Sequence, residues 1–135
     1  MIGARHVFYA ALPALLLGCA ASRAPEIDDA VQDFIAVSEL TEHEKIRTRG
    51  GYRYDELGER YVIITTVKHQ YLVQFTRRCR ELYEAAITPD LRREANVLRA
   101  GYDTLRGCRI DRIYAVEEAQ AQELMAIGER PGAES

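Results

Sequence analysis

The sequence contains no tryptophan, and it contains no apolar run long enough to cross a membrane as a helix. Without tryptophan, an aromatic platform for a sugar would have to be built from tyrosines. The longest apolar run covers residues 7–17, which is about half of the roughly twenty residues that a transmembrane helix needs. A run of this length suits the hydrophobic region of a secretory signal peptide instead.

The motifs of common enzymes and metal sites are also missing. No serine after residue 18 stands in a Gly-x-Ser-x-Gly turn. His43 lies in a segment typical of a solvated charged turn, and His69 is expected to be exposed in a hairpin turn, so no cluster of zinc ligands is indicated. Asp55 and Glu59 are close in sequence, but a glycosidase needs two carboxylates at a fixed separation across a cleft. We therefore expect a non-catalytic protein without metal or cofactor.

Positive charge does not dominate either, because 18 lysines and arginines face 21 acidic residues and leave a net charge of −3. This balance argues against a nucleic-acid-binding protein, which needs a concentrated basic surface. Arginines nevertheless flank two of the cysteines. They could bind anionic headgroups, lipopolysaccharide phosphates or an acidic partner, or they could pair with acids on a mixed surface. This candidate binding patch comprises Arg77, Arg78, Arg80, Arg109 and Arg112.

The N-terminal residues have the pattern of an export signal. Arg5 provides the positive charge, residues 7–17 provide the apolar region, and acidic, polar sequence follows abruptly. The alternative is a buried helix at the start of a globular domain, which Pro13 disfavours because it interrupts the run.

The apolar segment ends in the sequence LLGC, residues 16–19, which resembles the lipobox of bacterial lipoproteins. The resemblance implies cleavage after residue 18 and lipid on the Cys19 thiol. An ordinary secretory signal cut at Ala20 or Ala21 would instead discard Cys19. Lipoproteins of this kind carry three acyl chains, and more than one chain is needed for stable attachment to a membrane.

By resemblance to the enterobacterial sorting pattern, Ala20 after the cysteine favours the outer membrane over the inner one. We therefore expect residues 1–18 to be the signal peptide and residues 19–25 to be a lipidated tether. The rest of the protein should face the periplasm.

With Cys19 acylated, Cys79 and Cys108 remain as a pair in an oxidising compartment, and we expect them to form a disulfide. A loop of about thirty residues closed in this way would stabilise the fold by roughly 3–4 kcal/mol in the chain-entropy model. A redox pair is the alternative, but catalytic dithiols usually have Cys-x-x-Cys spacing.

Residues 26–128 predict a single α+β domain with a small antiparallel sheet and amphipathic helices at both ends. The centre of the fold is a predicted hairpin in which two β-branched and aromatic runs, 61–67 and 71–76, flank a short polar turn. Apolar residues at three- and four-residue spacing predict helices over 26–38 and 117–127, the second with Gly128 at its C-cap.

The shorter elements are less regular. A short helical or looped segment is expected after Cys79, and residues 129–135 are expected to fray. Residues 89–100 fit either a helix capped near Pro89 or a loop that enters a strand at 96–100. Further strands are expected over 45–49, 52–60 (ending in a turn), 103–105 and 109–115.

The succession YLVQFTRRC, YDTLRGCRIDRIYAV and a short C-terminal helix resembles a family of small proteobacterial lipoproteins known only as a domain of unknown function. The likeness covers most of residues 26–128. It implies an envelope location and paired cysteines, and it carries over no catalytic residue. Our main hypothesis is a lipid-anchored accessory or interaction domain. The alternatives are a binder of a small ligand or envelope polymer, through a groove lined by tyrosines and arginines, and a hydrolase.

Overall fold

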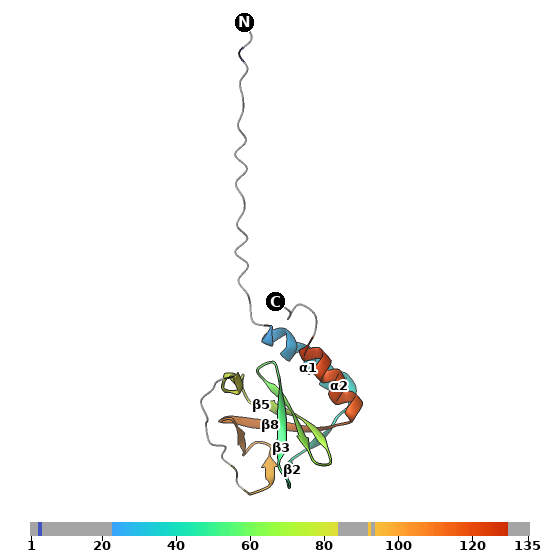
Figure 1. Cartoon of the computed structure of the whole chain (residues 1–135), viewed down its shortest axis with the longest axis vertical. Coiled ribbons are helices and arrows are strands. Elements are labelled where there is room, and N and C mark those ends of the chain that lie inside the picture. Colours follow the sequence, from blue (N-terminus) through green and yellow to red (C-terminus); the bar gives the residue numbers. More distant parts are fainter. Residues whose placement is uncertain (1–2, 4–22, 84–91, 93, 130–135) are drawn as a thin grey trace.

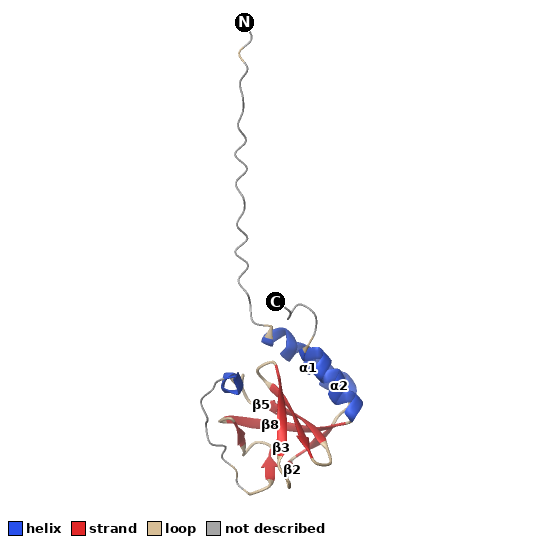
Figure 2. Ribbon diagram, viewed as in Figure 1, coloured by secondary structure: helices blue, strands red, loops and turns tan. Residues whose placement is uncertain are grey.

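The computed structural model of the chain describes residues 3, 23–83, 92 and 94–129 (Figure 1). An antiparallel sheet has two helices on one face and a second, two-stranded sheet on the other (Figure 2). The α+β prediction with helices at both ends is therefore confirmed. The predicted signal peptide, Cys19, Pro89 and the tail beyond Glu129 lie outside the described residues.

The main sheet is built around the predicted hairpin, which is confirmed. Strands β4 (Tyr61–Thr66) and β5 (Gln70–Phe75) pair antiparallel, and the strand order is β1-β8-β5-β4-β3, with a short β7 beside β8. Strand β1 was not predicted, because its charged sequence joins the sheet only through pairing with β8, far along the chain. The remaining bounds are Thr41–His43 for β1, Tyr52–Leu57 for β3, Thr104–Leu105 for β7 and Cys108–Val116 for β8.

The side chains of β4 show why both faces of the sheet are covered. Tyr61 and Ile63 pack toward the helices, whereas Val62 and Ile64 pack on the opposite face, and all four are buried. Because successive side chains of a strand point to opposite faces, a continuous apolar run is typical of a strand buried on both. Each large apolar side chain buried in this way contributes about 1.5–3 kcal/mol.

Helix α1 (Ala24–Ser38) confirms the predicted N-terminal helix. Pro25 lies in its first turn, where the missing N–H costs no helical hydrogen bond. Val31 and Phe34 lie three residues apart and are buried against the sheet.

Helix α2 (Glu118–Gly128) confirms the predicted C-terminal helix, except at its end. Its start is stabilised by Gln120, whose side-chain oxygen accepts a hydrogen bond from the backbone N–H of Glu117 at 2.9 Å. The predicted C-cap is wrong, because Gly128 is still helical and Glu129 is the C-cap. Glycine is needed there for close packing, since a Cβ at position 128 would lie 3.1 Å from Cδ2 of Leu57.

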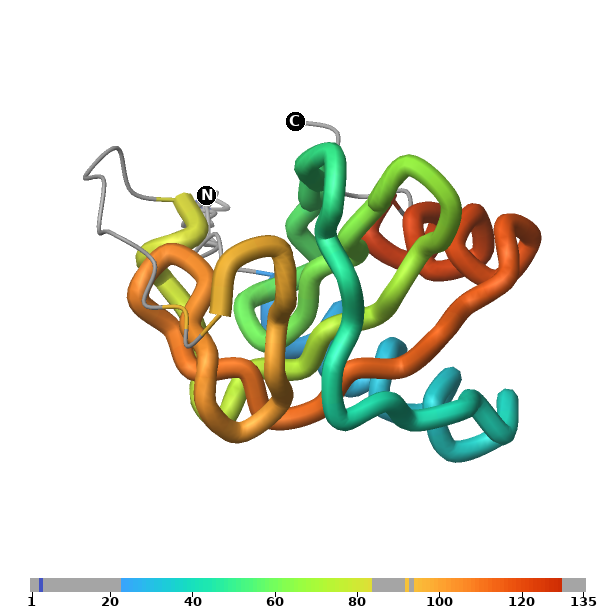
Figure 3. The backbone as a smooth tube through the Cα atoms, turned by 90° about the horizontal axis from the view of Figure 1, so that it is seen from below, coloured from blue at the N-terminus to red at the C-terminus, as the bar shows by residue number. Residues whose placement is uncertain are grey.

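The second face of the sheet is covered by the small sheet of β2 (Lys45–Arg47) and β6 (Val97–Arg99) and by the 3₁₀ helix η1 (Arg80–Tyr83). Figure 3 shows β2 and β6 side by side. Ile46 and Leu98 face each other in this pair and are buried. Of the two possibilities for residues 89–100, the strand at 96–100 is confirmed, and Asn96 at φ +59° makes the turn into it.

Asp28 joins the start of α1 to the turn between β3 and β4. Its Oδ1 accepts hydrogen bonds from the backbone N–H groups of Glu59 and Arg60, both at 3.1 Å. Gly58 lies beside it at φ +60°, and a Cβ there would collide with the Asp28 carboxylate. Burial raises the pKa of the Asp28 carboxyl above its ordinary value, although the two N–H groups act in the opposite direction.

The substitution Asp28→Ala is expected to lower the free energy of unfolding by about 1–3 kcal/mol, because it leaves two backbone N–H groups without their acceptor. Asp28→Asn, which keeps an acceptor oxygen without the charge, is the matched control. Urea unfolding of both variants and the wild type measures these differences.

The raised pKa of Asp28 also predicts a pH dependence. The folded state holds the proton more readily than the unfolded state, so ionisation destabilises the wild type as the pH rises from the unfolded-state pKa through the folded-state pKa. The wild type should therefore gain stability relative to Asp28→Asn when the pH falls from neutral to below the ordinary aspartate range. A difference between the two proteins that stays constant with pH would contradict this.

Candidate binding cleft

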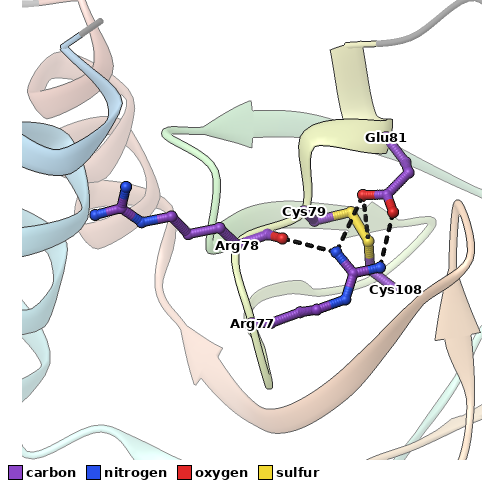
Figure 4. Close-up of polar contacts among 5 residues, drawn as sticks. All are labelled: Arg77, Arg78, Cys79, Glu81 and Cys108. Carbon is purple, nitrogen blue, oxygen red and sulfur yellow. Dashed lines mark hydrogen bonds and ion pairs between the residues drawn. A yellow bond between two sulfur atoms is a disulfide. The ribbon is translucent and has the colours of Figure 1, made fainter.

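A disulfide holds the arginine-rich segment after β5 against β8, as predicted. The Cα atoms of Cys79 and Cys108 lie 5.8 Å apart, and both residues are fully buried (Figure 4). The carboxylate of Glu81 lies 3.3 Å from Sγ of Cys108. A disulfide sulfur has no proton to donate, so this is a close contact and not a hydrogen bond. The three side chains are near enough to hold a metal ion, but metal binding would require free thiolates, which the disulfide removes.

Two of the five predicted patch arginines lie beside this disulfide and point in different directions. Arg77 forms an ion pair with Glu81 at 2.7 Å, whereas Arg78 extends toward the start of α1 (Figure 4). The ion pair and hydrogen bonds from Arg77 hold the pKa of the Glu81 carboxyl below its usual range. The pair is exposed, so its contribution to stability is small.

The other three patch arginines are distributed along the chain. Arg80 lines a pocket of about 480 Å³ beside the start of α1. Arg109 and Arg112 are exposed on β8, and Arg112 lies 3.6 Å from the carboxylate of Glu42. Acidic neighbours thus offset the charge of Arg77 and Arg112, which leaves the predicted patch with less positive charge than its sequence suggests.

A stronger concentration of positive charge lines a cleft between β2 and the turn that joins β4 to β5. In Figure 3, β2 has β6 on one side and this turn, residues 66–70, on the other. The cleft has a volume of about 690 Å³, and its apolar lining includes Ile46, Val67 and Tyr71. No carboxylate is among the described residues that line it, and the cations there are Lys45, Arg47, Arg49 and Lys68.

The alternating sequence of β2 positions two of these cations, Lys45 and Arg47, and Arg49 follows in the turn after the strand. Ile46 and Thr48 are buried at 3% and 1% exposure, whereas Lys45, Arg47 and Arg49 are exposed. Alternate residues of a strand lie on one side at a spacing of about 7 Å, so Lys45 and Arg47 begin a row that Arg49 continues in the turn. Within the described part of the chain, these three residues form no ion pair, and neither does Lys68 on the opposite turn. The row is therefore a local concentration of positive charge on a protein of net charge −3. The same three cations also line a smaller pocket with Glu94, whose carboxylate already pairs with Arg99 at 2.8 Å.

Tyr71 connects this cleft with a second pocket, of about 760 Å³, on the other side of the β4–β5 turn. The rings of His43 and His69 contact Tyr71 edge-on, at centroid distances of 6.1 and 6.2 Å. Burial raises the pKa of the Tyr71 hydroxyl. The second pocket also contains Glu117 and Glu118, so its lining is less positive than that of the cleft.

This cleft was not predicted from the sequence, which indicated a binding patch around the cysteines. The predicted charged turn at His43 is wrong, because His43 lies in β1. The alternation of charged and uncharged residues over 45–49 was a usable indication of an exposed cationic row. The opposite wall could not be found, because the turn at 66–70 meets β2 only in the folded protein.

The sequence of the chain also matches a known family over most of its length. A model of a family of unknown function, DUF6491, matches residues 3–127. The chain belongs to the DUF6491 family. Membership of a family without an assigned function, as expected from the sequence, is thereby confirmed. No curated protein and no solved structure gives a significant match to this DUF6491 protein.

The cleft of this DUF6491 protein has the chemistry of a binding surface. Its cations attract anions, and its apolar residues favour a ligand that also carries apolar groups. The Thr66 hydroxyl is held in the turn by hydrogen bonds with the backbone N–H and C=O of His69, both at 3.0 Å. Within the described residues, no helix is long and apolar enough to cross a membrane.

Proposed function

We propose that this DUF6491 protein is a lipid-anchored protein of the bacterial cell envelope, and that its folded domain is a non-catalytic interaction domain facing the periplasm. Signal cleavage after residue 18 makes Cys19 the acylated N-terminus, with palmitate among its acyl chains and the outer membrane as its location. The lipobox-like sequence supports this proposal. The family match, which begins at residue 3, includes the same segment.

The disulfide is the single observation that carries the proposal. Disulfides persist in oxidising compartments and are rare in the cytosol, so the pairing of Cys79 with Cys108 favours an exported protein. The chain has three cysteines. Pairing of these two leaves Cys19 as the one thiol that can receive a lipid.

The arrangement of the domain also suits an anchored interaction module. The chain enters α1 at one end of the domain, beside Gly58, whereas β2 and the turn at 66–70 lie at the opposite end (Figure 1). Residues 19–23 span at most about 18 Å, at roughly 3.3–3.6 Å per extended residue. A domain tethered so closely would direct its cationic cleft away from the membrane that holds the lipid.

A second candidate function is binding of a small ligand or envelope polymer in the cleft. The observation that favours it is the aromatic side chain of Tyr71 in a cleft whose described lining contains four cations and no carboxylate. The negative charge of an anionic sugar or polymer would pair with these cations, and its apolar groups would contact the ring of Tyr71.

The anchoring proposal is tested by labelled-palmitate incorporation and membrane fractionation of the full chain and its variants. The wild type should carry the label in the outer-membrane fraction, and Cys19→Ala should lose the label and become soluble. The Cys79→Ala/Cys108→Ala double variant is the matched control, because it lacks the other two thiols and should still be labelled. Unlabelled, soluble wild-type protein would show that the anchoring proposal is wrong.

A further inference from the structure

The outer edge of β2 is open toward the cationic cleft. On its inner edge, the N–H of Thr48 donates to the C=O of Asn96, and the C=O of Glu44 accepts from the N–H of Ala100, both at 2.8 Å. In an antiparallel pair such bonds recur at every second residue. The N–H and C=O groups of Lys45 and Arg47 therefore point away from β6, and within the described residues they have no hydrogen-bond partner.

An open strand edge is a template for an added strand, and main-chain hydrogen bonds then supply much of the affinity. Here the edge is exposed, borders a cleft of about 690 Å³ and carries the side chains of Lys45 and Arg47. The facing wall contributes the cation of Lys68 and the side chain of Val67, which is 74% exposed. An occupant that matches these groups is extended, acidic and partly apolar, and it carries peptide groups.

We propose that the cleft binds an extended acidic segment of a partner protein as an additional strand on the outer edge of β2. This inference rests on the proposed interaction role and specifies the kind of partner. Residues directly opposite each other in neighbouring strands share a face, so the partner residues opposite Lys45 and Arg47 are acidic. The residues between them point toward Ile46, Val67 and Tyr71 and are apolar. The partner segment therefore alternates acidic and apolar side chains.

Cations on an edge strand have another use, which is to prevent association with other strands. An edge protected in this way would bind no peptide. A cleft that only attracts anions would bind an acidic peptide without pairing to its backbone. Both possibilities are separate outcomes of the experiment.

The test is a fluorescence-anisotropy titration of the full chain in detergent with a labelled peptide of about eight residues that alternates glutamate and valine. The wild type should bind it, and binding should weaken as salt is added. Arg47→Glu should raise the dissociation constant about tenfold or more, because it places like charges together. Arg109→Glu is the matched control, since it makes the same change of charge on β8, outside the residues that line the cleft.

Two N-methylated peptides test the backbone pairing on the wild-type protein, which removes any concern about the folding of a variant. One is methylated on the glutamate nitrogens and the other on the valine nitrogens. Strand addition predicts that only one of the two loses affinity, because alternate N–H groups of an added strand face β2. Equal binding of both peptides, or equal weakening by Arg47→Glu and Arg109→Glu, would overturn the inference. Absence of any binding would overturn it as well, while palmitate labelling would still decide the anchoring proposal independently.

Discussion

Replacing Cys79 and Cys108 together by alanine is expected to lower the free energy of unfolding by about 3–4 kcal/mol. The two cysteines are separated by 29 positions, and the bond between them restricts the unfolded chain over that loop. Both residues are fully buried within the cluster that fills the face of the sheet opposite the helices. A domain of this size has a stability of about 5–15 kcal/mol, so the loss is a large fraction of the total.

Urea unfolding followed by far-UV circular dichroism measures this loss, since the chain has no tryptophan to report on unfolding by fluorescence. Cys19→Ala is the matched control and should leave the free energy of unfolding unchanged, because this cysteine lies before the folded domain. A loss below about 1 kcal/mol in the double variant would show that the disulfide does not stabilise the domain through its loop.

A loss of similar size is expected for Phe75→Ala, at about 3–5 kcal/mol. Phe75 is fully buried at the end of β5, in the same cluster as the disulfide. Its backbone N–H donates to the C=O of Arg60 at 2.8 Å, so the surrounding backbone is held in place and has little freedom to collapse around the missing ring. The cost therefore includes both the lost apolar contact and the cavity that remains.

Val67→Ala is the control for Phe75→Ala, because Val67 is 74% exposed and its truncation should change stability by no more than about 0.5 kcal/mol. Equal effects of the two substitutions in thermal or urea unfolding would contradict the assignment of Phe75 to the core. Phe75→Ala should also be non-additive with the double cysteine variant, since these residues belong to one buried cluster.

The parts of the fold that the sequence predicted are those with strong local patterns. The β-branched and aromatic residues of 61–67 and 71–76 predicted the central hairpin, which is confirmed as β4 and β5. Apolar spacing predicted both helices, and the cysteine count predicted the disulfide. For the hairpin and the helices, the residues that decide the structure lie close together in sequence. For the disulfide, only two cysteines remain once Cys19 is acylated, so only one pairing is possible.

The parts that the sequence missed depend on distant partners. The strand expected over 45–49 is present as β2, although it ends at Arg47. Strand β1, by contrast, exists because His43 lies opposite Ile113. Such pairings are non-local, and a three-residue strand has too few residues to show a period of its own. The end of α2 was wrong for a related reason, since Gly128 is explained by its contact with Leu57 and not by helix capping.

The cleft illustrates the same limit for function. The exposed cations over 45–49 can be read from alternation, but which acidic residues lie near them cannot. Conversely, the arginines around the disulfide look like a patch in sequence, and the structure places Glu81 beside Arg77 and Glu42 beside Arg112. Charge on a surface depends on which acids lie nearby, and that is fixed only by the fold.

The most direct test of the anchored-domain proposal is the intact mass of the protein purified from membranes after thiol alkylation without reduction. The proposal predicts a chain that begins at Cys19, carries acyl groups on that residue and has no alkylated thiol, because Cys79 and Cys108 are bonded to each other. A chain that retains residues 1–18 without lipid, or one alkylated at both later cysteines, would contradict it.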